Sequence, residues 1–222
     1  MIKTFELLSF AVSAAAFGCA AFYFFRPKTP KYFQLYACAA GCYMLEELWV
    51  IVNSLLGNGS RDGLVTVRLV GFFGCLCFML SANVNGFDKL VDEGQDRKAR
   101  ALAYIAPVLL LVLYALYAFS PLNADPVPVI VIGLISISPA LFASYFNLKH
   151  LLLPKDETGF LDITEKINAF ALIFYVINYA YPLAYLHCPN TLMSAYDLLL
   201  TAILFVIVIL CKKGAEQWKA LI

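Results

Sequence analysis

Charged side chains are scarce in this sequence. Only 14% of its 222 residues are Asp, Glu, Lys or Arg, whereas 62% are hydrophobic, and soluble domains carry about 25% charged residues. So few charges cannot cover a water-soluble globule of this size, which excludes a soluble enzyme and a disordered tail. The net charge of +1 also attracts no nucleic acid. We therefore expect a surface that faces membrane lipid, and no nucleic-acid partner.

Residues that carry metal or catalytic chemistry are equally few. The two histidines, His150 and His187, are too distant from each other for a di-metal or haem site. The seven cysteines include no C-x-x-C pair, so they indicate neither a zinc site nor a disulfide framework. The sequence also lacks H-E-x-x-H, G-x-S-x-G and phosphate-binding loop motifs. We therefore expect no enzymatic activity, no cofactor and no metal site.

Long apolar segments are what the sequence does contain. A helix needs about 20 apolar residues to cross the roughly 30 Å hydrocarbon core of a bilayer. Strands are excluded because a membrane strand needs an alternating pattern that this sequence lacks. Seven segments qualify, which predicts one all-α, polytopic membrane domain over residues 1–222. The seven predicted transmembrane helices are Phe5–Phe25, Tyr32–Leu56, Leu64–Val84, Ala101–Phe119, Val127–Asn147, Ile167–His187 and Leu192–Cys211.

The basic residues predict how these helices are oriented. Alternation of the seven segments places thirteen of the 16 Lys and Arg residues on one side of the membrane. That side holds Arg26, Lys28, Lys31, Lys89, Arg97, Lys98, Arg100, Lys149, Lys155, Lys166, Lys212, Lys213 and Lys219, and the other side holds Lys3, Arg61 and Arg68. Basic residues are retained in the cytoplasm, so we predict an N-terminus outside and a cytoplasmic C-terminus.

Polar side chains within the predicted spans gather in their outer halves. An ionisable group at the centre of a span costs about 2.5–3.5 kcal/mol, so each such group needs a reason. Glu46 and Asn53 share a helix face because seven residues separate them. We predict an outward-open site for a small-molecule ligand, formed by Glu46, Glu47, Asn53, Arg68, Tyr175, Asn178, Tyr181 and Asp197.

A structural role for the same residues is the alternative. Arg68 then pairs with Glu47 or Asp197, and the tyrosines form an interfacial belt. Adjacent residues point about 100° apart on a helix, so one of Glu46 and Glu47 is expected to serve the pocket and the other to face a neighbouring helix or the interface. The inner halves of the spans are expected to be mostly apolar, which argues against a path to the cytoplasm and favours sensing over transport.

Small residues in the first predicted helix, such as Ala14 and Gly18, allow helices to approach closely. We expect this contact to lie within the chain, and a homodimer face is the alternative. Gly71 and Gly74 in the third predicted helix are interpreted in the same way.

Three segments, taken in order, give the sequence a resemblance to a known family. Tyr43-Met44-Leu45-Glu46-Glu47 lies late in the second predicted helix, Arg68-Leu69-Val70-Gly71-Phe72-Phe73-Gly74 opens the third, and Arg100-Ala101-Leu102-Ala103-Tyr104-Ile105-Ala106-Pro107 starts the fourth. This order resembles the seven-helix sensor domains at the N-terminus of bacterial histidine kinases and diguanylate cyclases. The resemblance implies sensing of an external or membrane-dissolved cue in a bacterial plasma membrane, with Glu46, Glu47 and Arg68 at the matching positions.

We therefore expect an integral membrane sensor or receptor-like protein that binds a small ligand. No kinase, cyclase or DNA-binding sequence follows the last predicted helix, so the signal is expected to pass to a cytoplasmic or membrane partner chain. The alternative is a small-solute transporter or a substrate-binding membrane subunit that uses the same pocket. A third option is an accessory subunit whose polar residues are purely structural.

Overall fold

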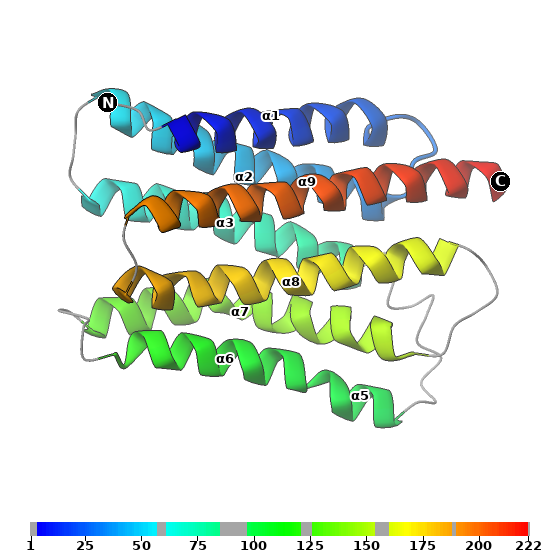
Figure 1. The fold of residues 1–222 in the computed structure, drawn as a ribbon. Coiled ribbons are helices and arrows are strands. Elements are labelled where there is room, and N and C mark those ends of the chain that lie inside the picture. The colour runs from blue at the N-terminus through cyan, green and yellow to red at the C-terminus, as the bar shows by residue number, and fades with distance from the viewer. Residues whose placement is uncertain are drawn as a thin grey trace.

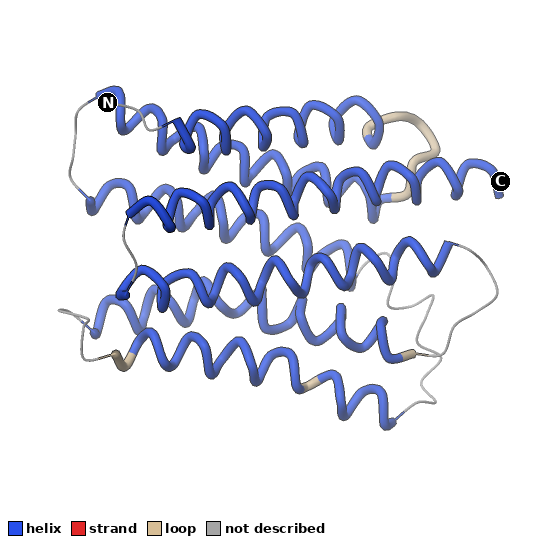
Figure 2. The backbone as a smooth tube through the Cα atoms, viewed as in Figure 1, coloured by secondary structure: helices blue, strands red, loops and turns tan. Residues whose placement is uncertain are grey.

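The computed structural model describes residues 4–56, 61–84, 97–120, 126–153, 160–187 and 190–221. Within these ranges every regular element is a helix, so the all-α prediction is confirmed (Figures 1 and 2). The helices are α1 (Thr4–Phe24), α2 (Lys31–Leu56), α3 (Arg61–Ala82), α5 (Arg97–Ala103), α6 (Ile105–Ala118), α7 (Pro126–Leu152), α8 (Phe160–His187) and α9 (Asn190–Leu221).

One helix covers each predicted segment except the fourth, which is divided between α5 and α6, and the boundaries differ from those predicted. α8 begins at Phe160, before the predicted Ile167, and α9 continues to Leu221, beyond the predicted Cys211. Among the residues that the structure describes, four stretches are both long and apolar enough to cross a membrane. They are Thr4–Phe24, Lys31–Asn53, Arg97–Ala118 and Ala195–Trp218, and Val70–Ala82 is a shorter apolar stretch.

The fourth predicted segment forms two helices because a proline interrupts its hydrogen bonding. Pro107 has no N–H, so the carbonyl of Ala103 loses its α-helical donor. Directly after Ala103, the Tyr104 N–H donates to the carbonyl oxygen of Ala101 at 3.3 Å, which is a tighter turn. α5 therefore ends at Ala103 and α6 begins at Ile105.

α6 continues in the direction of α5, and the other consecutive helices run in alternate directions, so the two termini lie at opposite ends of the bundle (Figure 1). α1 contacts α2 and α9, and α9 also contacts α2 and α8. α3 packs against α2 and α7, while α6 packs against α7 and α8. The interior therefore lies mainly among α2, α3, α7, α8 and α9, with α1 and α6 on its flanks.

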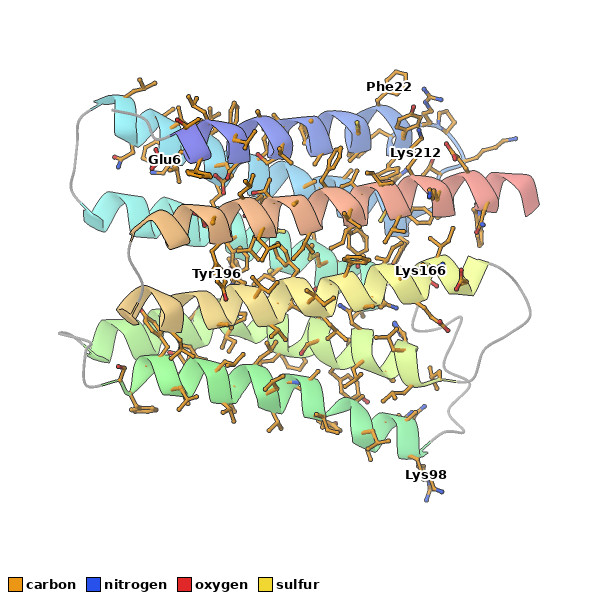
Figure 3. All side chains as sticks on the ribbon, viewed as in Figure 1. Glu6, Phe22, Lys98, Lys166, Tyr196 and Lys212 are labelled. Atoms are coloured by element: carbon orange, nitrogen blue, oxygen red, sulfur yellow. The ribbon has the colours of Figure 1, made fainter. Side chains whose placement is uncertain are left out.

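Cations gather toward the end of the bundle that holds the C-terminus. Lys98, Lys166 and Lys212 lie toward that end, whereas Glu6 and Tyr196 lie toward the other end (Figure 3). This arrangement agrees with the distribution of basic residues that predicts the orientation. Which side of a membrane each end faces stays a prediction.

The bundle has apolar side chains outside and many polar side chains inside. On α6, Ile105, Val108, Val112 and Leu116 are 49–59% exposed. A soluble protein seldom presents such a continuous apolar surface. The polar residues that have no exposed surface at all are Ser13, Asn83, Ser144, Asn147, Thr164 and Thr201. This inverted polarity suits a protein whose helices are surrounded by hydrocarbon.

Glycines allow α2 and α3 to pack closely. A Cβ atom added at Gly71 would lie 2.9 Å from the Cβ atom of Glu46, and one added at Gly74 would lie 3.0 Å from the sulfur of Cys42. The expected packing role of these two glycines is confirmed. Gly18 differs, because it is exposed and a Cβ atom there would meet nothing within 4 Å. The expectation that Gly18 makes a close contact inside the chain is therefore wrong.

Replacing these glycines by alanine tests the α2–α3 contact. We expect Gly71→Ala to lower the free energy of unfolding by about 1–3 kcal/mol, because the added methyl group overpacks the contact with Glu46. The matched control Gly18→Ala should leave stability unchanged or raise it slightly, since alanine favours helix. Thermal unfolding in detergent, followed by circular dichroism, measures both. Equal effects of the two substitutions would contradict the close contact.

Candidate functional site

The second helix carries both predicted glutamates into the interior. Glu46 is 4% exposed and Glu47 is 2% exposed, and Asn53 is also buried, at 9%. Although neighbouring side chains on a helix point about 100° apart, neither glutamate lies on the outside of the bundle. Two carboxyl groups are buried at one level of α2.

Glu46 lies against α3. Its Cβ atom faces Gly71, whose missing side chain makes room for it. One turn further along α3, the thiol of Cys75 is fully buried and interacts electrostatically with the carboxyl group of Glu46. α2 and α3 together thus hold Glu46 between a glycine and a thiol.

Three carboxyl groups lie around one tyrosine hydroxyl. The hydroxyl of Tyr43 interacts electrostatically with Glu47, Glu46 and Asp197. It also lies 3.5 Å from the hydroxyl of Thr201, which itself donates to the carbonyl oxygen of Asp197 at 2.8 Å. We call these five residues, from α2 and α9, the acidic cluster. Its chemistry suits a ligand that brings positive charge or hydrogen-bond donors.

Aromatic rings form one wall beside the acidic cluster. The ring of Tyr43 meets the ring of Phe174 on α8 edge to face, with centroids 5.9 Å apart. Phe174 also stacks on Phe72 of α3, with centroids 6.0 Å apart. These rings hold the Tyr43 side chain in place, so its hydroxyl is directed by packing as well as by the contact with Thr201.

The predicted residues on α8 do not all join the acidic cluster. Tyr175 is fully buried, but its hydroxyl donates to the sulfur of Met79 at 3.5 Å. Asn178 is half-buried, and the neighbouring Tyr179 is the buried residue, with its hydroxyl donating to the carbonyl oxygen of Ser136 at 3.2 Å. The side chains of Arg68 and Tyr181 lie outside the described part, so the predicted ion pairs of Arg68 stay predictions.

A second group of buried polar residues lies toward the end of the bundle that holds the C-terminus. The side-chain amide of Asn83, directly after α3, donates to Asn147 Oδ1 on α7 and to the carbonyl oxygen of Met79. The Tyr175 hydroxyl also interacts with Asn147 and with Tyr36 of α2. We call Tyr36, Asn83, Asn147 and Tyr175 the inner polar cluster. All four have no exposed surface.

The inner polar cluster places tyrosines and asparagines in the part of the spans that was expected to be mostly apolar. That expectation weighed charged residues and passed over neutral tyrosines and asparagines, which insert at lower cost. Sequence reasoning also missed Tyr43 and Thr201 of the acidic cluster, and Cys75, which interacts with Glu46 of that cluster. A signal for the inner cluster was present, because Cys75, Met79 and Asn83 follow one another at intervals of four residues, a spacing that brings helical side chains to neighbouring positions.

Within the described residues, no group of three or more His, Cys, Asp or Glu side chains is arranged to hold a metal ion. Comparison with protein-family models, with curated proteins and with solved structures finds no match. The function must therefore be inferred from the chemistry of the acidic cluster and the inner polar cluster.

A double-mutant cycle tests the contact between Asn83 and Asn147. We expect Asn83→Leu and Asn147→Leu each to lower the free energy of unfolding by about 1–3 kcal/mol, because each leaves the partner amide buried without its hydrogen bond. The double variant should lose less than the sum of the two, since no orphaned amide remains. Thermal unfolding measures the cycle, with Asn178→Leu as the half-buried control. Strictly additive losses would contradict the pairing.

Proposed function

We propose that the chain is an integral membrane protein with seven transmembrane helices, its N-terminus outside and its C-terminus in the cytoplasm. The four long apolar stretches support this directly. α3, α7 and α8 contain 22, 27 and 28 residues, and about 20 residues are enough to cross the hydrocarbon core. α7 and α8 are less apolar because they carry polar residues such as Asn147, Asn168 and Tyr175, which are buried inside the bundle.

The proposed activity is sensing: the acidic cluster binds a small ligand from outside, and the change passes to a partner chain. The observation that carries this proposal is the gathering of Glu46, Glu47 and Asp197 around the Tyr43 hydroxyl. Like charges within a membrane span are costly, so they are retained where they serve a ligand, an ion or a proton. A ligand with positive charge or hydrogen-bond donors would complement these carboxyl groups.

α9 supports a signalling role because it joins the acidic cluster to the opposite end of the bundle. It is a single helix of 32 residues without a proline. Asp197 and Thr201 lie near its beginning, and Lys212 lies toward the cationic end (Figure 3). A displacement of Asp197 on ligand binding would therefore move the cytoplasmic end of α9 as well, where a partner chain could respond.

Transport of a small solute is the second candidate, and the inner polar cluster favours it. Glu46 interacts with Cys75, and Cys75 interacts with both Tyr36 and Tyr175. Polar side chains therefore continue from the acidic cluster toward the cationic end instead of stopping at mid-bundle. A solute would meet hydrogen-bonding groups along this route, as transport requires.

Labelling of introduced cysteines tests the proposed orientation. Thr4→Cys and Gln217→Cys place thiols on exposed positions at opposite ends of the bundle. On intact cells, we expect a membrane-impermeant maleimide to label Thr4→Cys and to label Gln217→Cys only after permeabilisation, because basic ends stay in the cytoplasm. The chain without an introduced cysteine provides the background. Labelling of Gln217→Cys on intact cells would overturn the outward-facing ligand site.

Ligand binding is tested on the full chain reconstituted in proteoliposomes. Amines, amino acids, sugars and carboxylates are screened for a rise in unfolding temperature, since a ligand at 100 times its Kd stabilises by about 2.7 kcal/mol. We expect Tyr43→Phe and Glu47→Gln to remove the rise, and Glu6→Gln, at the same end of the bundle, to keep it. If Glu47→Gln and Tyr43→Phe bind like the wild type, the acidic cluster is not the site. Counterflow of the stabilising solute would replace sensing by transport.

A further inference from the structure

Two cations and two aromatic rings meet where α1 ends beside α9. The ammonium nitrogen of Lys212 lies 4.2 Å from the centroid of the Tyr23 ring, and the guanidinium carbon of Arg26 lies 5.3 Å from the same centroid. Arg26 also covers the ring of Phe22, at 4.3 Å from its centroid. We call Phe22, Tyr23, Arg26 and Lys212 the cationic cluster, and Figure 3 labels Phe22 and Lys212 toward the cationic end of the bundle.

The local structure holds Arg26 in place. Its Nε atom donates to the carbonyl oxygen of Phe22, four residues earlier, at 3.0 Å. This carbonyl belongs to the last turn of α1, where carbonyl groups have no intrahelical donor. The Arg26 side chain is exposed, and the fork of N–H donors on a guanidinium matches the geometry of a phosphate group. Arg26 is therefore oriented at the surface before any anion binds.

Glu216 brings a carboxylate to the cluster without neutralising it. Its Oε1 atom lies 3.9 Å from the ammonium nitrogen of Lys212, and the two side chains are 61% and 38% exposed. An ion pair this long and this exposed contributes little. Arg26 and Lys212 carry two positive charges against the one carboxylate of Glu216, so these three side chains together keep a net positive charge.

The cluster lies at the level where a membrane helix meets the lipid headgroups. α1 contains 21 residues, about the length that crosses the hydrocarbon core, and Arg26 follows its last residue by two positions. Phe22 is 64% exposed and Phe25 is 55% exposed. Gly18, one turn before Phe22, is exposed with open space around it. An anion at the cluster therefore has apolar protein surface beside it, which favours a lipid over a free anion or an acidic protein segment.

We propose that the cationic cluster binds the phosphate group of an anionic phospholipid, with an acyl chain along the exposed face of α1 at Phe22 and Gly18. Basic residues at a membrane surface attract anionic lipids, and the aromatic rings hold these cations in position. The proposal rests on the membrane location proposed above, but it needs neither the proposed orientation nor the acidic cluster. Asp197 of that cluster lies near the beginning of α9, whereas Lys212 lies toward the opposite end.

Lipid titration of the full chain in detergent micelles tests the site. Phosphatidylglycerol and phosphatidylcholine with identical acyl chains are added in steps, and bound lipid is counted by native mass spectrometry. We expect phosphatidylglycerol to bind about tenfold more tightly, and inorganic phosphate at the same ionic strength not to displace it. Equal binding of the two lipids, or displacement by phosphate, would overturn the proposal. A chain that stays folded and dispersed without detergent would instead overturn the membrane location.

Single substitutions assign the binding to the cluster. Arg26→Gln and Lys212→Gln are each expected to weaken phosphatidylglycerol binding about fivefold. Glu216→Gln should strengthen it, because the competing carboxylate is removed, and this gain tests the site even if a cation variant folds poorly. Lys166→Gln is the matched control, since Lys166 lies toward the same end and pairs with Asp162 at 2.7 Å (Figure 3). An equal loss in Lys166→Gln, or unchanged binding in Arg26→Gln, Lys212→Gln and Glu216→Gln, would overturn the proposal.

Discussion

The hydrogen bond between Asn83 and Asn147 illustrates the main constraint on this bundle. Polar side chains must form their hydrogen bonds with one another in the interior. Much of the described outer surface is built from apolar side chains such as Ile105, Val108 and Leu116, which form no hydrogen bonds. Hydrocarbon around it would offer none either. The chain therefore places amides, hydroxyls and carboxyl groups on the inner faces of α2, α3, α7, α8 and α9, and the two polar clusters are the result of this requirement.

Close packing makes this interior possible. Gly71 and Gly74 bring α3 near enough to α2 for Glu46 to be covered by backbone and by Cys75. Between lipid-facing helices no hydrophobic force drives association, so contacts of this kind and hydrogen bonds supply it. The aromatic contacts of Tyr43, Phe174 and Phe72 add to the packing on the α8 side of the acidic cluster.

The helical architecture could be predicted from the sequence because the length of an apolar run reports directly on a helix. The division at Tyr104 was missed although its cause, Pro107, is visible in the sequence, since a proline near the start of a helix is also compatible with an unbroken one. Glu46, Glu47 and Asp197 could be selected because charge within a span is conspicuous. Their grouping around Tyr43 could not, because it depends on α2 lying beside α9. Tyr36, Asn83 and Asn147 carry no charge, so the sequence hints at this cluster only through the spacing of Cys75, Met79 and Asn83, and its grouping depends on how the helices pack.

Residues of α3, and Asn83 directly after it, connect the two polar clusters. Gly71 rests on Glu46, Cys75 interacts with Glu46 and with Tyr175, and Asn83 follows the last turn of the same helix. Gly71 and Asn83 lie about 18 Å apart along the helix axis, at 1.5 Å per residue. A shift of α3 along its axis would therefore change the contact between Gly71 and Glu46 and the position of Asn83 together.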